Sequence, residues 1–413
     1  MSTDLTRVVK TYDVRGLVDS ELTEEIVEAL GAAFVDVIGA GGSTVCVGHD
    51  MRDSSPRFVS AFAKGARARG ADIVLLGLCS TDETYFASGA WNMPSAMFTA
   101  SHNPSSYNGI KLSRAGAQSL SGDTGLFEVR DRAQDYLESG IPAVDEPGTM
   151  SERDVLAEYA SYVRELVDVS RVRPLRIVID AGNGMAGLTV PAVMGVGAGL
   201  PVLPLEIIPM YFELDGSFPN HEANPLNPDN IVDLQRAVVA HGADIGLAFD
   251  GDADRCFVVD EFGNPVSPST VAAIVAGREI RRVQAAGEKD VTVLHNLITS
   301  DIVPQTIRAA GARAVRTNVG HSLIKDIMRT TGAVFGGEHS AHYYFRDFWG
   351  ADNGMLAALH IIAELGHNSE PLSALAARFS PYVESGEINS VVDDVESSLA
   401  RIRDTFAGRG EFD

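Results

Sequence analysis

The sequence has little cysteine, no long apolar run and no leader-like start. Three cysteines occur in 413 residues, at Cys46, Cys79 and Cys256. Their wide spacing excludes a disulfide framework and a cysteine zinc site. No stretch approaches the ~18 apolar residues of a membrane-spanning helix. The segment from Asp4 to Arg15 is rich in charge, which is not typical of a signal peptide, so we expect a cytoplasmic protein.

Cations are scarce as well. Lys and Arg number 33 against 56 Asp and Glu, and the formal net charge is −23 at pH 7. Such a chain is not expected to bind nucleic acid or an anionic membrane surface. An anionic small molecule would require the few cations near its site to be gathered there. The length and the 45% hydrophobic content predict a folded protein of about three domains, with no pattern that indicates an oligomeric state.

One series of strand and helix signals occurs three times along the chain. Each copy opens with an apolar strand run that is followed by a helix-like stretch and a second short strand. A third strand then runs into the most polar loop of its copy, and a fourth short strand follows. The three polar loops are 99–102, 250–254 and 337–340. Strands that alternate with helices predict α/β sheets, whose ligands gather at the carboxyl ends of strands.

We therefore predict an α/β fold with three topologically similar domains around a central cleft. The start of a truncated fourth domain, of α+β type, is expected after them. The predicted domains are 1–148, 149–256, 257–368 and 369–413. Within the last, we expect helices at 371–378 and 395–406 and a strand at 388–392.

The second polar loop places three carboxylates on alternate residues, at Asp250, Asp252 and Asp254. Carboxylates this close repel one another unless a cation lies among them, and oxygen ligands favour Mg²⁺ or Ca²⁺. An EF-hand is excluded because its sixth position, which requires glycine, is Arg255, and because the flanking segments are strand-like. A solvated acidic turn is disfavoured by those apolar flanks. We predict a Mg²⁺ site, since Mg²⁺ tolerates a shell completed by a phosphate oxygen.

The first polar loop reads Thr-Ala-Ser-His-Asn-Pro and places Ser101 beside His102 and Asn103. Serine is a poor nucleophile unless a base, a cation or a metal supports its oxygen. A polar corner at the end of a strand also has a purely structural interpretation. The loop by itself leaves both interpretations open.

Taken together, the Thr-Ala-Ser-His-Asn-Pro, Asp-Gly-Asp-x-Asp-Arg and Gly-Glu-x-Ser-x-His loops resemble those of the α-D-phosphohexomutases. The bacterial phosphomannomutase/phosphoglucomutase branch is the most similar. Segments 10–16 and 317–325 extend the resemblance, which covers residues 10 to about 360. It implies three related α/β domains around a deep cleft and a fourth domain that closes over it.

The resemblance also implies the reaction and its main residues. Ser101 would be the phosphoserine that gives a phosphoryl group to the sugar and takes another back. Asp250, Asp252 and Asp254 would hold Mg²⁺ together with a phosphoserine oxygen at Ser101. The expected ligands are hexose phosphates, with a hexose bisphosphate as intermediate and activator. We predict interconversion of mannose 1-phosphate and mannose 6-phosphate, with phosphoglucomutase or phosphoglucosamine mutase activity as alternatives.

Further residues complete the predicted site. Arg15, Lys111 and Arg255 are expected to neutralise phosphoryl oxygens. Either His321 or His342 is expected to take the proton of the attacking hydroxyl, with His321 preferred, because imidazole titrates near neutral pH. We expect His102 to orient the serine loop. The predicted substrate-binding residues are Tyr12, Arg255, Thr317, Gly320, Lys325, Glu338, Ser340 and His342.

Two other function classes remain open. Gly182–Gly187 fits the G-x-G-x-x-G pattern after a strand, with Glu206 about twenty residues on, as in an NAD-dependent oxidoreductase. A tight structural turn is the alternative for that segment. A non-catalytic sugar-phosphate binding protein is the second class, since no Arg-x-Ser-x-Thr-Glu-Pro-type phosphate loop occurs before Asp413. Ala341, where many relatives have glycine, restricts φ and bears on sugar preference.

Overall fold

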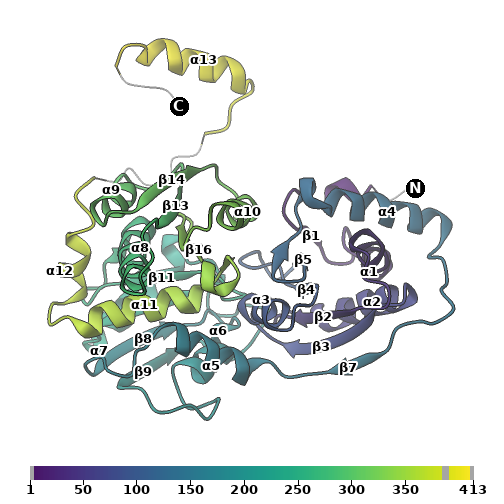
Figure 1. Ribbon diagram of the computed structural model, residues 1–413, viewed down its shortest axis with the longest axis horizontal. Coiled ribbons are helices and arrows are strands. Elements are labelled where there is room, and N and C mark those ends of the chain that lie inside the picture. Colours follow the sequence, from purple (N-terminus) through teal and green to yellow (C-terminus); the bar gives the residue numbers. More distant parts are fainter. Residues whose placement is uncertain (1–3, 384–389, 410–413) are drawn as a thin grey trace. The chain divides into compact units, whose positions relative to one another are not determined.

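The computed structural model describes residues 4–383 and 390–409, except for the side chains of 321 and 322. The chain forms two compact units, Met1–Ser380 and Pro381–Asp413 (Figure 1). Each unit is described by itself. The first carries three mixed sheets, and the second carries one helix among the residues described.

The first sheet has the strand order β1-β5-β4-β2-β3-β7, with β6 paired to β5. Its strands are β1 (Val14–Leu17), β2 (Thr44–His49), β3 (Asp72–Leu78), β4 (Ser95–Phe98), β5 (Tyr107–Arg114), β6 (Gln118–Ser119) and β7 (Met150–Glu152). The associated helices are η1 (Leu5–Arg7), α1 (Glu24–Ile38), α2 (Ser55–Ala68), α3 (Thr81–Ala90), η2 (Gly122–Thr124) and α4 (Leu126–Ser139). Helix α1 packs against α2 and α4, and α3 packs against β2 and β4.

The second sheet has the order β12-β11-β10-β8-β9. Its strands are β8 (Leu175–Asp180), β9 (Leu205–Met210), β10 (Ile245–Phe249), β11 (Cys256–Val259) and β12 (Pro265–Val266). Its helices are α5 (Leu156–Leu166), α6 (Ala186–Val193), η3 (Pro228–Ile231) and α7 (Val232–His241). Every residue of β10 is buried, as its apolar sequence predicts for a central strand.

The third sheet has the order β14-β13-β15-β16-β17. Its strands are β13 (Thr292–Asn296), β14 (Arg313–Thr317), β15 (Phe335–Gly337), β16 (Tyr343–Phe345) and β17 (Ala351–Asp352). Its helices are α8 (Pro268–Ala285), α9 (Ile302–Ala309), α10 (His321–Thr331), η4 (Arg346–Phe348), α11 (Gly354–His367) and α12 (Leu372–Ala377).

The three sheets share one topology. In each, a central strand (β2, β8 or β13) lies parallel between an outer strand (β3, β9 or β14) and a third strand (β4, β10 or β15). The third strand pairs antiparallel with the strand that follows it in sequence (β5, β11 or β16). The prediction of three similar α/β domains is confirmed. The polar loops noted in the sequence all follow the third strand of their sheet.

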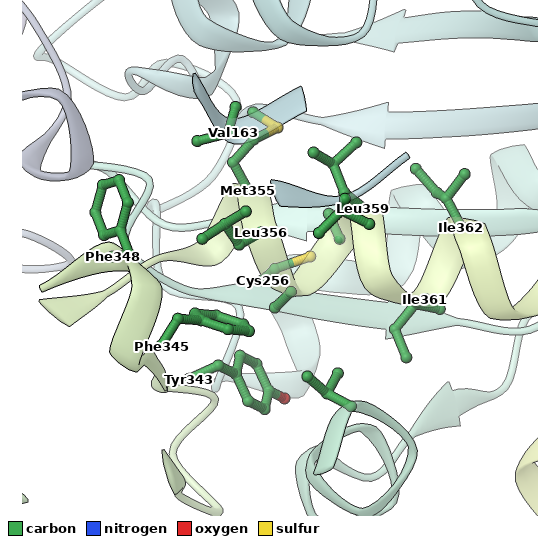
Figure 2. Packing of buried hydrophobic residues seen from close by; sticks show 14 of the residues in the cluster. Val163, Cys256, Tyr343, Phe345, Phe348, Met355, Leu356, Leu359, Ile361 and Ile362 are labelled. Carbon is green, nitrogen blue, oxygen red and sulfur yellow. The ribbon is translucent and has the colours of Figure 1, made fainter. Parts of the chain in front are cut away.

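One buried cluster continues from the second sheet into the third. Figure 2 shows α11 with buried side chains on more than one side, with Val163 of α5 on one side and Tyr343 of β16 on another. Aromatic contacts join the first domain to the other two, since Phe86 of α3 lies edge-on to Tyr159 of α5 and to Trp349. The three domains are therefore held together by apolar packing, and their loops keep fixed positions relative to one another.

The sheets extend past the divisions expected from the sequence. Strand β7 pairs with β3 beyond the division at 148/149. The division at 256/257 falls within β11, which pairs with both β10 and β12, so the second sheet runs to Val266. Helix α12 buries Leu372 and Leu375 in the same cluster as α11, although it was assigned to the fourth domain. Strand pairing and packing set these borders, and neither is visible in local composition.

The C-terminal unit contains α13 (Val395–Phe406), whose first turn is capped by Asp394 through Ser397 N at 3.0 Å. This helix was expected. The expected strand at 388–392 begins among residues 384–389, which lie outside the described part, and Ser390–Val392 are irregular. Among the described residues, no helix combines the length and apolar character needed to cross a membrane.

Candidate active site

A cavity of about 290 Å³ lies where loops from the three sheets meet. The serine loop follows β4, the acidic loop follows β10, and Glu338–His342 follows β15. The cavity is lined by Tyr12, Asp13, Arg15, Ser101, His102, Lys111, Asp254, Arg255, His342 and Asp352. Equivalent strand ends of three similar domains thus supply one pocket, as ligand sites at the carboxyl ends of α/β strands require.

Ser101 is nearly buried and has a left-handed backbone, with φ of +49°. Its Oγ donates to Asp250 Oδ2 at 2.8 Å and lies 3.1 Å from His102 Nδ1. Arg255 Nη2 donates to the same Oγ over 3.3 Å. The serine oxygen therefore lies between a carboxylate, a guanidinium and an imidazole, and Ser101 is one of the residues that line the cavity.

The acidic loop is buried, and ligand oxygens of Asp250, Asp252 and Asp254 lie within 4.8 Å of one another. Asp252 Oδ1 and Asp254 Oδ1 are buried without a hydrogen-bond partner. Unpartnered buried carboxylate oxygens are costly, and a hard cation satisfies them. Burial raises the pKa of Asp250 to about 7, with Arg255 acting against it. The donor set fits a metal that prefers oxygen.

Lys111 joins the first domain to this loop. Its Nζ donates to Asp252 Oδ2 at 2.7 Å and to Asp254 Oδ2 at 2.6 Å. Burial disfavours the ammonium, but the two carboxylates outweigh it and hold the pKa of Lys111 well above its usual value. At Asp254, likewise, burial is outweighed by Lys111, which lowers the carboxyl pKa to about 2. Lys111 thus places a fixed positive charge of the first domain against the acidic loop.

His102 is neutral in this setting. Its Nδ1 accepts from Arg255 Nη2. Burial, followed by the charges of Arg255 and Arg15, lowers the pKa of His102 to about 3. Arg15 itself donates to Asn103 Oδ1 at 2.5 Å and to the Ala100 carbonyl at 3.3 Å. The geometry suits His102 as an acceptor that orients the serine loop.

The third loop is fixed by its own hydrogen bonds. Glu338 accepts from Asn296 Nδ2 at 3.0 Å and from the Tyr344 hydroxyl at 2.6 Å. Ser340 Oγ lies 3.0 Å from His342 Nδ1, and His342 Nε2 lies 3.9 Å from Asp254 Oδ1. Burial lowers the pKa of His342, so its ring is neutral near pH 7.

Several predicted substrate-binding residues are not among those that line the cavity in the described structure: Thr317, Gly320, Lys325, Glu338 and Ser340. Lys325 is 3% exposed, pairs with Asp352 at 2.5 Å and lies over the Tyr85 ring. Thr317 is buried at the end of β14. A Cβ on Gly320 would lie 2.7 Å from the Tyr12 hydroxyl, so this glycine permits Tyr12 to approach. The side chain of His321 lies outside the described part.

The sequence reasoning missed Arg52. This arginine follows β2, is 1% exposed and directs its guanidinium at the serine loop. The sequence did contain an indication of this residue. Arg52 distinguishes the first repeat from the other two, since the loops after the corresponding strands β8 and β13 have no arginine at this point. A buried arginine three residues after a strand requires a local partner, and Asp50 supplies one through its Oδ2 at 3.2 Å.

The Gly182–Gly187 segment is a packing turn. A Cβ on Gly184 would lie 2.7 Å from the Gly251 carbonyl oxygen, and one on Gly187 would lie 2.2 Å from that of Phe212. Glu206 pairs with Arg176 at 3.0 Å near the amino ends of β9 and β8, at the sheet edge opposite to the glycines. An acidic residue at that edge cannot reach a ribose bound at the glycine turn. The geometry therefore disfavours the dinucleotide alternative.

Comparison with known proteins agrees with this geometry. Family profiles described as phosphoglucomutase/phosphomannomutase alpha/beta/alpha domains I, II and III match residues 6–137, 157–263 and 267–382. The chain belongs to the phosphoglucomutase/phosphomannomutase family. It is thus a member of the α-D-phosphohexomutase superfamily and a phosphohexomutase, that is, an isomerase that acts as an intramolecular phosphotransferase.

Individual relatives cover most of the chain. A protein of Xanthomonas campestris named "Phosphohexose mutases" is 39% identical over 396 residues, which are 95% of this chain and 85% of the relative. A phosphomannomutase of Salmonella typhimurium is 36% identical over 405 residues, 96% and 86% of the two chains. The crystal structure of a phosphoglucomutase/phosphomannomutase family protein from Burkholderia thailandensis matches with a TM-score of 0.81 at 30% identity. That match covers 91% of this chain and 80% of the other.

Proposed function

We propose that this enzyme interconverts mannose 1-phosphate and mannose 6-phosphate, with Ser101 as the phosphoryl carrier. The observation that carries the proposal is that Ser101 lines a cavity shared by three domains while its Oγ contacts Asp250 and Arg255. We place mannose before glucose as the proposed substrate because the Salmonella and Escherichia coli relatives are named phosphomannomutases. Glucose 1-phosphate and glucosamine 1-phosphate are the alternative substrates.

In the forward step, a sugar hydroxyl oxygen forms a bond to phosphorus while the bond from phosphorus to Ser101 Oγ breaks. The attacking hydroxyl gives up its proton and Ser101 Oγ gains one as it leaves, so the products are a hexose bisphosphate and a free serine. After the sugar turns in the cavity, Oγ takes the other phosphoryl group and the cycle closes. Such a transfer depends mainly on positioning and on neutralisation of charge.

The chain's own residues supply both requirements. Arg255 contacts the serine oxygen directly, and Arg15 lines the cavity beside it, so both can hold phosphoryl oxygens. His342 lines the cavity as a neutral imidazole and can accept the hydroxyl proton. Asp250, Asp252 and Asp254 would hold Mg²⁺, which supplies Lewis-acid neutralisation of phosphoryl charge when it is bound.

The test compares Ser101→Ala with Ser105→Ala, an exposed serine of the same loop. Each variant and the parent chain are incubated with a hexose 1,6-bisphosphate and Mg²⁺, and their intact masses are measured. We expect one phosphate on the parent and on Ser105→Ala, and none on Ser101→Ala. A coupled assay on mannose, glucose and glucosamine 1-phosphates then ranks the sugars. A Ser101→Ala variant that keeps its phosphate or most of its mutase activity would overturn the mechanism.

A further inference from the structure

Arg52 is bound to the serine loop through both terminal nitrogens of its guanidinium. Nη2 donates to the carbonyls of Ser101 at 3.0 Å and Asn103 at 2.7 Å. Nη1 donates to the carbonyls of Pro104 at 2.8 Å and Tyr107 at 3.0 Å. Nε donates to Asp50. Four donors of a planar fork, anchored by the fifth on Asp50, thus set the backbone path from residue 101 to residue 107.

The loop that Arg52 holds does not lie in an easy conformation. A non-glycine residue with φ near +49°, as at Ser101, is strained and persists when its surroundings over-determine it. The Ser101 carbonyl is fixed on two sides, by Arg52 and by Gly251, whose added Cβ would lie 2.4 Å from that oxygen. The same residue therefore carries both the reactive oxygen and the carbonyl that Arg52 holds.

A loop of the second domain covers Arg52. The Arg52 guanidinium carbon lies 5.1 Å from the centre of the Phe218 ring. A Cβ on Gly216 would lie 2.7 Å from Arg52 Cα, so the loop passes against the arginine backbone. Phe218 is 9% exposed and has a φ of +53°, a strained value for a phenylalanine. Two residues with strained backbones therefore contact one buried guanidinium.

We propose that Arg52, covered by Phe218, is a positioning residue that holds Ser101 Oγ against the acidic loop for phosphoryl transfer. This inference rests on the proposed role of Ser101 as the carrier. Arg52 does not line the cavity, so it acts through the loop rather than on the sugar. Loosening the loop should therefore slow transfer and leave sugar binding nearly unchanged, because ~1 Å of misplacement is enough to cost a large factor in rate.

The experiment uses Arg52→Lys and Phe218→Leu in the full chain. Their matched controls are Arg57→Lys, whose guanidinium lies 5.0 Å from the Phe58 ring, and Phe262→Leu, an exposed ring. Leu keeps the backbone limits of Phe, so Phe218→Leu removes the ring face without relieving the strain. We expect kcat to fall at least about tenfold in Arg52→Lys and about threefold in Phe218→Leu, with KM for mannose 1-phosphate changing less than about twofold.

Hydrogen exchange of the amides of residues 99–107 gives a readout that does not depend on turnover. Exchange there should rise in both variants and stay at the parent level in both controls. If Arg52→Lys does not fold, Phe218→Leu decides the matter. Parent-like kcat and exchange in Phe218→Leu would overturn the proposal, as would a rise in exchange spread over the whole first sheet. A parent chain without phosphate on Ser101 would refute the proposed function. The exchange comparison would still test whether Arg52 and Phe218 hold the serine loop in place.

Discussion

Gly251 of the acidic loop has no side chain, and this allows its backbone to pack directly against the Ser101 carbonyl of the serine loop. A Cβ built on it would lie 2.4 Å from the Ser101 carbonyl oxygen, whereas ordinary contacts begin at 3.4 Å. Gly251→Ala must therefore push the two backbones apart by about 1 Å, because Arg52 prevents the carbonyl from turning away. The φ of Gly251 lies outside the left-handed region, so alanine adds a steric conflict and no backbone strain.

The displacement acts where the hydrogen bond from Ser101 Oγ to Asp250 measures 2.8 Å. A shift of about 1 Å breaks that bond and misplaces the serine oxygen, which typically lowers kcat by about a hundredfold. Overpacking in a close-packed site costs a further 1–3 kcal/mol, roughly, of unfolding free energy. We expect Gly251→Ala to fold, to lose most mutase turnover, and to accept phosphate from a hexose bisphosphate slowly.

The control is Gly277→Ala in α8, where the nearest atom to an added Cβ is 3.5 Å away, at the end of the Arg281 side chain. Alanine in a helix interior is about 1 kcal/mol better than glycine, so this variant should be as stable as the parent or more so, with parental kcat. The measurements are steady-state kinetics, intact mass after bisphosphate treatment, and urea unfolding. Parental kcat in Gly251→Ala would refute the close approach of the two loops.

Two further predictions concern stability. Burial raises the pKa of Glu83 to about 8, above the 4.5 of an unfolded chain. The folded state therefore holds a proton that the unfolded state loses, so this contribution is full below pH 4.5 and is lost as pH rises to 8, by about 1.4 kcal/mol per pH unit. Glu83→Gln should flatten the fall in urea-unfolding free energy between pH 5 and 8 relative to the parent; an unchanged slope would contradict the shift. Gly65→Ala would place a Cβ 1.9 Å from the Glu28 carbonyl and force α1 from α2, which should cost about 3 kcal/mol or more of unfolding free energy. A Gly65→Ala chain with the parental melting temperature would show that the helices are not in this contact.

The sequence predicted those features of the fold that depend on residues close together in the chain. Apolar runs gave the central strands, as at 245–249, where β10 is observed. Alternating carboxylates gave the acidic loop, and three successive copies of one pattern gave three sheets of one topology. Each of these patterns lies within a short segment of the chain. The spacing of apolar residues and the local charge are therefore enough to predict the structure.

The sequence does not show contacts that two distant segments decide. Glu206 has the right separation from the glycine turn for a ribose contact, yet parallel pairing of β8 with β9 places it at the opposite edge of the sheet. Lys325, predicted to bind substrate, pairs with Asp352 in this structure and is buried, a partner that the sequence did not indicate. Spacing along the chain does not state which end of a strand a residue occupies or which carboxylate a cation meets.

The sequence by itself thus predicted the three domains and singled out the acidic loop and Ser101 as candidates for the site. The tertiary structure alone decided that Ser101 meets Asp250, 149 residues away, and that Arg52 lies under Phe218 of another domain. Those contacts arise from apolar packing between the domains, which fixes three strand ends around one cavity. Packing of that kind depends on the shape of whole surfaces, and no local pattern of residues encodes it.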